Sequence, residues 1–407
     1  MRSIRISLLL LAVLATAFSY NADACTAVVV SGKHNASGRA LMIKVRDSDN
    51  VTDMKSFKGP KYDFFGQTAN LDKTVEEIKG VVSGSNTAGL CVASLTPGKG
   101  FPCDTVKNKM SGGKLNFRAL GNCADLAEFE EMLKGLLKTR YVVAHIAALD
   151  AKGHAAMYEV IGDRYVKYDA DDPKVAPDGF RVMTNFTFAG DSALGHGQIR
   201  YDSTVEVMKS LPRTADGKFD LNPVTLMDAV TRSFNHTGHK VHSLADIKNH
   251  KYFKGEDFVT RNRTNTIVSF ESALPGEDAS KVSMWVNIAS PITTPAIPLI
   301  VNSGFIPEYL TGAPKTPATL VAASTMIRDK YVYDSDKSKP FDWFNVANTA
   351  ALIEKTRLVE EYIVRQYSSA LALWRAGKVS DEDFFALLRK QAPEYYNRFA
   401  TVYGQND

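Results

Sequence analysis

The feature that most constrains this chain is the junction between an apolar leader and a cysteine that opens a β-strand. Two arginines precede an apolar run over residues 8–18, which has the length of a signal-peptide core and is too short to span a bilayer. Ala22 and Ala24 then supply the small residues that a signal peptidase needs at its cleavage site. We therefore expect a signal peptide over residues 1–24 and a mature chain that begins at Cys25.

An N-terminal cysteine carries a thiol and a free α-amine on one residue. The amine has an unperturbed pKa of roughly 7.7–8.0 and can act as a base toward the thiol. We interpret Cys25 as a nucleophile. A lipidated cysteine is a second interpretation, but Ala22 and Asp23 stand where a lipoprotein signal usually carries Leu and a small residue. Half of a disulfide is a third.

Composition narrows the class of protein. With 407 residues and 44% apolar content, the chain can bury a large core. No linker divides it, so we expect one catalytic domain over 25–407 with a C-terminal helical segment at about 347–400. Removal of the leader lowers the net charge from +4 to +3, which does not indicate a polyanionic partner. Four cysteines are too few for a disulfide scaffold but allow one bridge among Cys91, Cys103 and Cys123.

Apolar and β-branched runs alternate with turn signals along most of the chain. They predict strands at 26–31, 40–45, 80–82, 88–95, 141–149, 155–160, 164–168, 180–184, 266–270 and 282–288, with a turn at 83–86. Helical spacing and capping residues predict helices at 126–137, 223–234 and about 347–374, and a last one from Ser380. Many strands with helices before, between and after them indicate an α+β fold in which helices cover sheets.

The first two predicted strands form a hairpin that starts at Cys25. The second strand would return the segment 46–49 to the level of the nucleophile. One other cluster carries chemistry: His236, His239 and His242 have a spacing that can gather imidazoles, but no carboxylate or cysteine pattern completes a metal site. We predict neither a metal nor a cofactor.

The mature start resembles that of the N-terminal-nucleophile cysteine hydrolases. Cys25-Thr26, a hydrophobic strand, Gly38, a second strand and the acidic run after Arg46 resemble most closely the dipeptidase A type. The choloylglycine hydrolase and penicillin V acylase family, and the acyl-coenzyme A:6-aminopenicillanic acid acyltransferase family, are looser matches. Segments 284–286 and 341–348 are similar to dipeptidase A landmarks. The resemblance implies an α+β four-layer αββα sandwich with C-terminal helices.

The resemblance also implies roles for particular residues. Cys25 would be the nucleophile and, through its amine, the base. Asp47 matches the aspartate that holds the nucleophile, with Arg46 in place of the family arginine, whose own position is taken by Lys44. In the choloylglycine register, the pair would instead be Arg46 and Asp49. Both registers remain open at this point.

Three further positions match the family pattern with different strength. Asn185 corresponds to the strand-end asparagine of the oxyanion hole, although it also begins an Asn-x-Thr sequon. Thr96 falls where the second oxyanion side chain would be. Arg200 is a weaker candidate for a family arginine beyond the asparagine.

These expectations combine into a functional hypothesis. The chain would be an exported amidase, periplasmic or secreted, that hydrolyses the C–N bond of a dipeptide or N-acyl amino compound. Acyl transfer and a non-catalytic, peptide-binding surface lipoprotein are the alternatives. The expected partner is a small amide or short peptide; we expect no nucleic acid and no stable membrane anchor, and leave homo-oligomerisation open.

Overall fold

The computed structural model describes residues 24–404 except 70–71, 99, 101–108 and 334–341. The expected signal peptide (residues 1–24, all but Ala24) and Cys103 lie outside the described residues. None of the helices in the described part combines the length and apolar character needed to cross a membrane.

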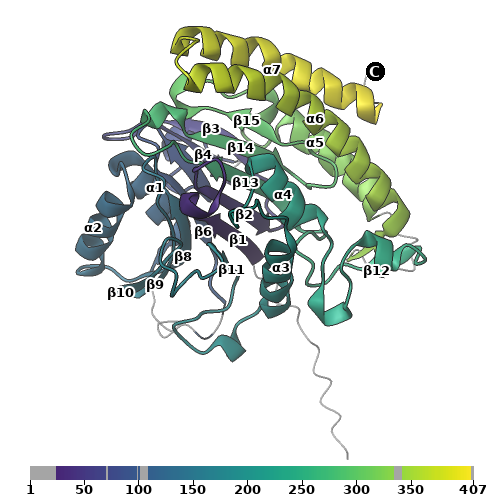
Figure 1. The fold of residues 1–407 in the computed structure, drawn as a ribbon, viewed down its shortest axis with the longest axis horizontal. Helices are drawn as coiled ribbons and strands as arrows, with labels where there is room; N and C mark the ends of the chain where they lie inside the picture. The colour runs from purple at the N-terminus through teal and green to yellow at the C-terminus, as the bar shows by residue number, and fades with distance from the viewer. Residues whose placement is uncertain (1–23, 70–71, 99, 101–108, 334–341, 405–407) are drawn as a thin grey trace, which may run out of the picture.

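Two antiparallel sheets form the centre of the described structure (Figure 1). Sheet I has the strand order β11 (Phe180–Met183), β1 (Ala24–Val30), β2 (Leu41–Asp47), β13 (Thr264–Glu271), β14 (Ser283–Ile288) and β15 (Ile297–Leu299). Sheet II has the order β10 (Arg164–Asp169), β9 (Ala155–Gly162), β8 (Val142–Leu149), β6 (Cys91–Leu95), β5 (Ser83–Asn86), β4 (Phe64–Thr68) and β3 (Asp53–Phe57), with β7 (Met110–Ser111) parallel to β8.

Helices cover the outer face of each sheet. The helices α1 (Gly112–Asn122) and α2 (Leu126–Leu137) pack on sheet II, while α3 (Gln198–Ser210) and α4 (Pro223–Arg232) pack on sheet I. Strands β1 and β2 contact β8 of the opposite sheet, so one apolar core lies between the sheets and a second lies beneath α1 and α2. The expected four-layer αββα arrangement is confirmed.

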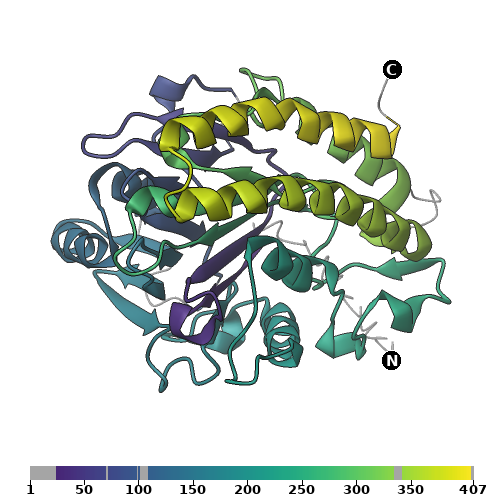
Figure 2. The ribbon, with the colours of Figure 1, turned by 45° about the horizontal axis from the view of Figure 1, so that its top comes forward.

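The C-terminal part adds three helices and a short ribbon. These are α5 (Thr319–Ile327), α6 (Val346–Arg375), α7 (Asp381–Tyr403) and the pair β12 (Tyr252–Lys254) with β16 (Trp343–Asn345). Helices α6 and α7 lie side by side across one face of the molecule (Figure 2). Tyr367 of α6 packs edge-on against Trp285 of β14, with ring centroids 5.0 Å apart, which seats the helical pair on sheet I.

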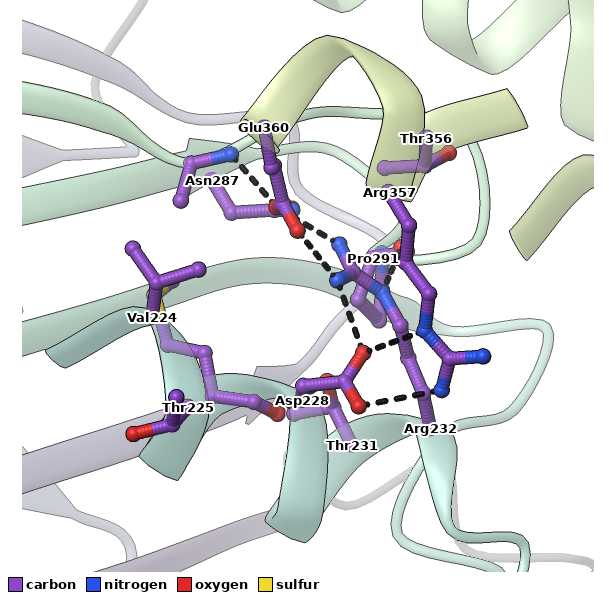
Figure 3. Close-up of polar contacts among 12 residues, drawn as sticks. Val224, Thr225, Asp228, Thr231, Arg232, Asn287, Pro291, Thr356, Arg357 and Glu360 are labelled. Atoms are coloured by element: carbon purple, nitrogen blue, oxygen red, sulfur yellow. Dashed lines mark hydrogen bonds and ion pairs between the residues drawn. The ribbon is translucent and has the colours of Figure 1, made fainter. Parts of the chain in front are cut away.

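A buried ion-pair network joins α4 to α6 (Figure 3). The guanidinium of Arg232 donates to both carboxylate oxygens of Glu360, at 2.6 and 2.8 Å. Asp228, one turn earlier on α4, accepts two hydrogen bonds from Arg357 at 3.0 Å each. Because the Arg232 and Glu360 side chains are only 1% and 5% exposed, this pair fixes how α6 lies against α4.

Local signals placed most elements correctly. Helix α2 begins at the predicted cap, where the Asp125 carboxylate accepts a hydrogen bond from the Glu128 backbone, and α6 begins within one residue of its predicted start. The prediction at 80–86 was wrong: the strand is β5, Ser83–Asn86, in the segment expected to be a turn. Its small residues are required by packing, since a Cβ on Gly84 would lie 2.3 Å from the Phe65 carbonyl oxygen.

Candidate active site

Cys25 lies near the start of β1, directly opposite Arg46 on β2. The expected return of the second strand to the level of the nucleophile is therefore confirmed. Directly opposed residues of an antiparallel pair share one face of the sheet, and so do residues two apart along a strand. Cys25, Arg46 and Lys44 accordingly face sheet II, whereas Asp47 points to the helix-covered face.

The Cys25 side chain borders a cavity of about 220 Å³ between the two sheets. Lys44 and Arg46 line it from sheet I, and residues of β6, β8 and the start of α1 line it from the other side. Thr96 and Pro97, which follow β6, lie at its edge, and Thr96 is exposed. The Cys25 thiol thus borders a cavity that a small ligand can enter.

Asn185 fixes the backbone nitrogen of Cys25. Its side-chain oxygen accepts a hydrogen bond from that nitrogen at 3.0 Å, and its amide nitrogen donates to the Thr96 carbonyl at 2.6 Å. Asn185 follows β11, which pairs with β1 in a register that sets Met183 opposite Ala27. The same register brings the position two residues beyond Met183 to the level of Cys25. Thr96 therefore contributes its backbone oxygen to this arrangement.

Arg200 holds the other side of the same group. It is 1% exposed and donates to the Cys25 carbonyl at 2.6 Å, to the Thr26 hydroxyl at 3.0 Å and to the Asn185 side-chain oxygen at 2.7 Å. Burial, reinforced by the positive charge of Arg261, lowers the pKa of Arg200 to about 10, so the guanidinium stays charged at neutral pH. Arg200, a weak candidate from the sequence, thus connects the Cys25 carbonyl, the Thr26 hydroxyl and the Asn185 side chain.

The two acidic candidates occupy different environments. Asp47 is buried opposite Ala24 and accepts hydrogen bonds from Arg261 at 2.7 and 3.0 Å and from the Thr264 hydroxyl at 2.6 Å. The Asp49 side chain is 67% exposed and pairs with Arg263. The structure therefore brings Asp47, and not Asp49, next to the level of Cys25.

Arg261 is a site residue that the sequence analysis missed. Burial acts to lower the pKa of its guanidinium, but the adjacent Asp47 carboxylate outweighs burial and the pKa is raised. The sequence signal that could have identified it is its position just before β13, the strand that pairs with β2, which ends at Asp47. Arg46, by contrast, donates to the Asn50 carbonyl at 3.0 Å and to Asn265 at 3.3 Å.

A second missed feature supports the loop that carries Asn185. Glu159 of β9 accepts hydrogen bonds from the backbone nitrogens of Phe188 and Ala189, at 2.7 and 2.8 Å. A ring nitrogen of His145 lies 3.0 Å from the Thr184 carbonyl oxygen. Burial lowers the pKa of this histidine. Glu159 and His145 both belong to sheet II. Sheet II therefore holds, through these hydrogen bonds, the segment of sheet I that carries Asn185.

The remaining clusters lie apart from Cys25. His236 and His239 stack at 4.2 Å, while His242 pairs with Glu206. Among the described residues, no group of three His, Cys, Asp or Glu side chains is arranged to hold a metal ion. Cys91 and Cys123 are free, buried thiols.

No protein-family model matches the sequence, and no curated protein is significantly similar to it. Among solved structures, the chain is similar to a penicillin V acylase from Agrobacterium tumefaciens, with 16% identity over 68% of this chain and 86% of that one and a TM-score of 0.39. It is also similar to a conjugated bile acid hydrolase from Clostridium perfringens, with 12% identity, coverage of 68% and 92%, and a TM-score of 0.43. An N-acylethanolamine-hydrolyzing acid amidase orthologue from Caenorhabditis elegans gives 14% identity, coverage of 60% and 92%, and a TM-score of 0.39.

Proposed function

We propose that this chain is an exported amidase that cleaves a linear amide or short-peptide C–N bond with the thiol of an N-terminal Cys25. The observation that carries the proposal is the set of hydrogen bonds that fixes the Cys25 backbone. Asn185 accepts a hydrogen bond from the Cys25 nitrogen, while Arg200 donates to the Cys25 carbonyl and to the Asn185 side chain. Every buried backbone nitrogen needs an acceptor, but the acceptor here is the side chain of Asn185 and not the backbone of a neighbouring strand. A side-chain acceptor can also hold this nitrogen once it is a free amine, as the proposed base requires.

Each step of the proposed reaction uses a group described above. With the leader removed, the Cys25 amine accepts the thiol proton and the sulfur attacks the substrate carbonyl. The amide of Asn185, which donates to the carbonyl of the cavity residue Thr96, is the proposed side-chain donor to the oxyanion, a contribution of roughly 3–4 kcal/mol per donor. The protonated amine then passes its proton to the departing nitrogen, and water hydrolyses the thioester. Asp47, opposite Ala24, lies at the level of the new amine and favours its protonated form.

The proposal requires that Ala24 be removed. While Ala24 is attached, the Cys25 nitrogen is an amide without a basic lone pair. Intact-mass measurement of the exported protein tests this directly, because a chain that begins at Cys25 with an unmodified amine is expected. A diacylglyceryl or acyl adduct would support the surface-lipoprotein alternative instead.

Two versions of the protein, both produced in the cytoplasm without the signal peptide, test whether the Cys25 amine is the base. One begins Met-Cys25, from which methionine aminopeptidase can expose the cysteine, and the other begins Met-Ala24-Cys25. We expect the first to hydrolyse members of a panel of dipeptides and N-acyl amino acids, and the second to fold but remain inactive. Equal turnover by both, with Ala24 still present in the mass spectrum, would show that another group is the base. Adding a second amine as acceptor distinguishes hydrolysis from acyl transfer.

A further inference from the structure

We infer that the cavity beside Cys25 binds an anionic group, so that the substrate carries a carboxylate on the part that enters the cavity. This inference rests on the proposed function for the role of Cys25 and adds the chemistry of the substrate. Two features of the cavity are electrostatically positive, and a third, its size and polar lining, limits what can enter.

The first feature is the pair of cations on sheet I. Lys44 and Arg46 both line the cavity, and their Cα atoms belong to the strand that pairs with the Cys25 strand. Lys44 is fully buried and Arg46 is 5% exposed. A cation held away from bulk water interacts with an anion far more strongly than an exposed one does.

The second feature is the beginning of helix α1. Ser111, Gly112 and Gly113 line the cavity, and the first backbone N–H groups of a helix have no partner within it. The Ser111 side chain makes no capping hydrogen bond to them. A Cβ on Gly112 would lie 2.6 Å from the Ser94 Cβ, so glycine is what allows the helix to begin this close to β6. The positive end of the helix dipole therefore lies at the same cavity as the two cations.

The third feature is the combination of size and polar lining. A cavity of about 220 Å³ is below the usual range for whole small-molecule sites, so it accommodates a short part of a substrate. The Thr96 hydroxyl adds a hydrogen-bond donor to the lining, whereas the Ser94 hydroxyl already donates to the Val82 carbonyl at 3.3 Å. A short chain that ends in a carboxylate, such as an amino-acid carboxyl group, matches this charge, size and donor set. An ammonium or a long apolar chain does not.

Alkylation of Cys25 tests the inference without requiring any turnover. The mature protein is treated in parallel with iodoacetate and iodoacetamide, which differ in charge but form the same bond to sulfur, and the carboxymethylated and carbamidomethylated Cys25 peptides are quantified over time. The ratio of the two rates cancels differences in thiol ionisation. We expect this ratio to exceed that of N-acetylcysteine under the same conditions by about tenfold or more, because the cavity attracts the anionic reagent.

Variants that remove one positive charge show which residue causes the preference for iodoacetate over iodoacetamide. Lys44→Met is expected to lower the iodoacetate-to-iodoacetamide ratio by about tenfold, while Lys138→Met, at an exposed position after α2, leaves it unchanged. Unchanged unfolding midpoints and circular dichroism verify that the variant is folded. If Lys44→Met fails to fold, the wild-type protein still decides: propionate should protect Cys25 from iodoacetamide better than propionamide does.

The outcomes separate this inference from the proposed function. A wild-type ratio equal to that of N-acetylcysteine, or equal protection by propionate and propionamide, overturns the anion site even if amides are hydrolysed. A high ratio that depends on Lys44 supports the site even if no amide in the panel is cleaved, and then only the proposed activity fails.

Discussion

The side-chain oxygen of Asn185 lies 3.0 Å from the backbone nitrogen of Cys25, although 160 positions separate the two residues in the chain. The contact is set by the antiparallel register of β1 and β11, which places the residue after the end of one strand at the start of the other. The same oxygen also accepts from Arg200 at 2.7 Å. The Cys25 nitrogen, the Asn185 side chain and the buried Arg200 guanidinium are thus joined by hydrogen bonds, so displacing one of them should also displace the other two.

The identity of the nucleophile can be tested with two cysteines of different environment. Cys25→Ala and Cys25→Ser are expected to lower amidase kcat/KM by about 10⁴-fold or more, as removal of a nucleophile does in other covalent hydrolases. Cys91→Ser should retain activity within a few-fold, because burial raises the pKa of Cys91 to about 12 and keeps that thiol protonated at neutral pH. Steady-state kinetics of the three purified variants, with circular dichroism to verify folding, provide the comparison. Near-normal turnover by Cys25→Ala would refute the assignment.

The position of Arg200 depends on a glycine at the start of α3. Gly197 has φ of +95°, and a Cβ there would lie 2.5 Å from an Arg200 guanidinium nitrogen and 3.0 Å from the Thr184 hydroxyl. Gly197→Ala must therefore displace the guanidinium that holds Cys25 and Asn185. We expect kcat to fall by roughly tenfold to a hundredfold, with KM changing less, because a misplaced catalytic group affects the reaction more than binding.

Gly217→Ala is the matched control for this variant. Gly217 also has a positive φ, +78°, but lies in an exposed turn where an added Cβ meets nothing within 4 Å. It carries the same kind of backbone strain, about 1–2 kcal/mol, without the clash. If both variants lose kcat equally, the loss reflects backbone strain or stability and the role given to Arg200 is incorrect.

The ion pair between α4 and α6 should dominate the attachment of the C-terminal helices. Glu360→Gln removes the bidentate carboxylate partner of the buried Arg232 guanidinium and leaves its 3.2 Å contact with Asp228 as the remaining ion pair, so we expect a loss of about 3 kcal/mol in the free energy of unfolding. The double variant Arg232→Met with Glu360→Leu should lose less than Glu360→Gln alone, because no unpaired charge is left buried. Guanidinium chloride unfolding measures both. Destabilisation of less than 1 kcal/mol by Glu360→Gln would show that the helices are held by apolar packing instead.

The neighbouring Asp228 gives this network a pH dependence. Burial acts to raise the pKa of its carboxyl group, but hydrogen bonds and charge from Arg357 and Arg232 outweigh burial, and the pKa is lowered. A carboxyl with a depressed folded-state pKa stabilises the protein above its unfolded pKa, about 3.9, and loses that contribution as pH falls through the folded-state value. The difference in unfolding temperature between wild type and Asp228→Asn should be constant above pH 5 and shrink below pH 4. A difference that persists to pH 2 would contradict this account.

Elements with strong local signals could be predicted from the sequence, and those shaped by distant packing could not. Helix α2 has its cap and apolar spacing within its own residues, and its predicted bounds match the structure. Helix α1 was missed because Gly112 and Gly113 resemble a helix breaker, yet those glycines are what allow close packing against sheet II. Strand β5 was taken for a turn because Ser83 and Gly84 have low strand propensity, and its position is decided by β4 and β6 on either side.

The sequence by itself determined the hairpin that returns the segment 46–49 to the level of Cys25, because a turn signal lies between two apolar strands. The register that sets Cys25 opposite Arg46, and Asp47 beside it, is a finding of the structure. Only the tertiary structure decided which distant residues meet that hairpin. Asn185, Arg200 and Arg261 reach Cys25 and Asp47 from 160, 175 and 214 residues away, because β11 and β13 flank the hairpin in sheet I and α3 packs behind it. These long-range pairings are stabilised by the apolar surface that whole strands and helices bury together. A short stretch of sequence does not show which distant element it will pack against.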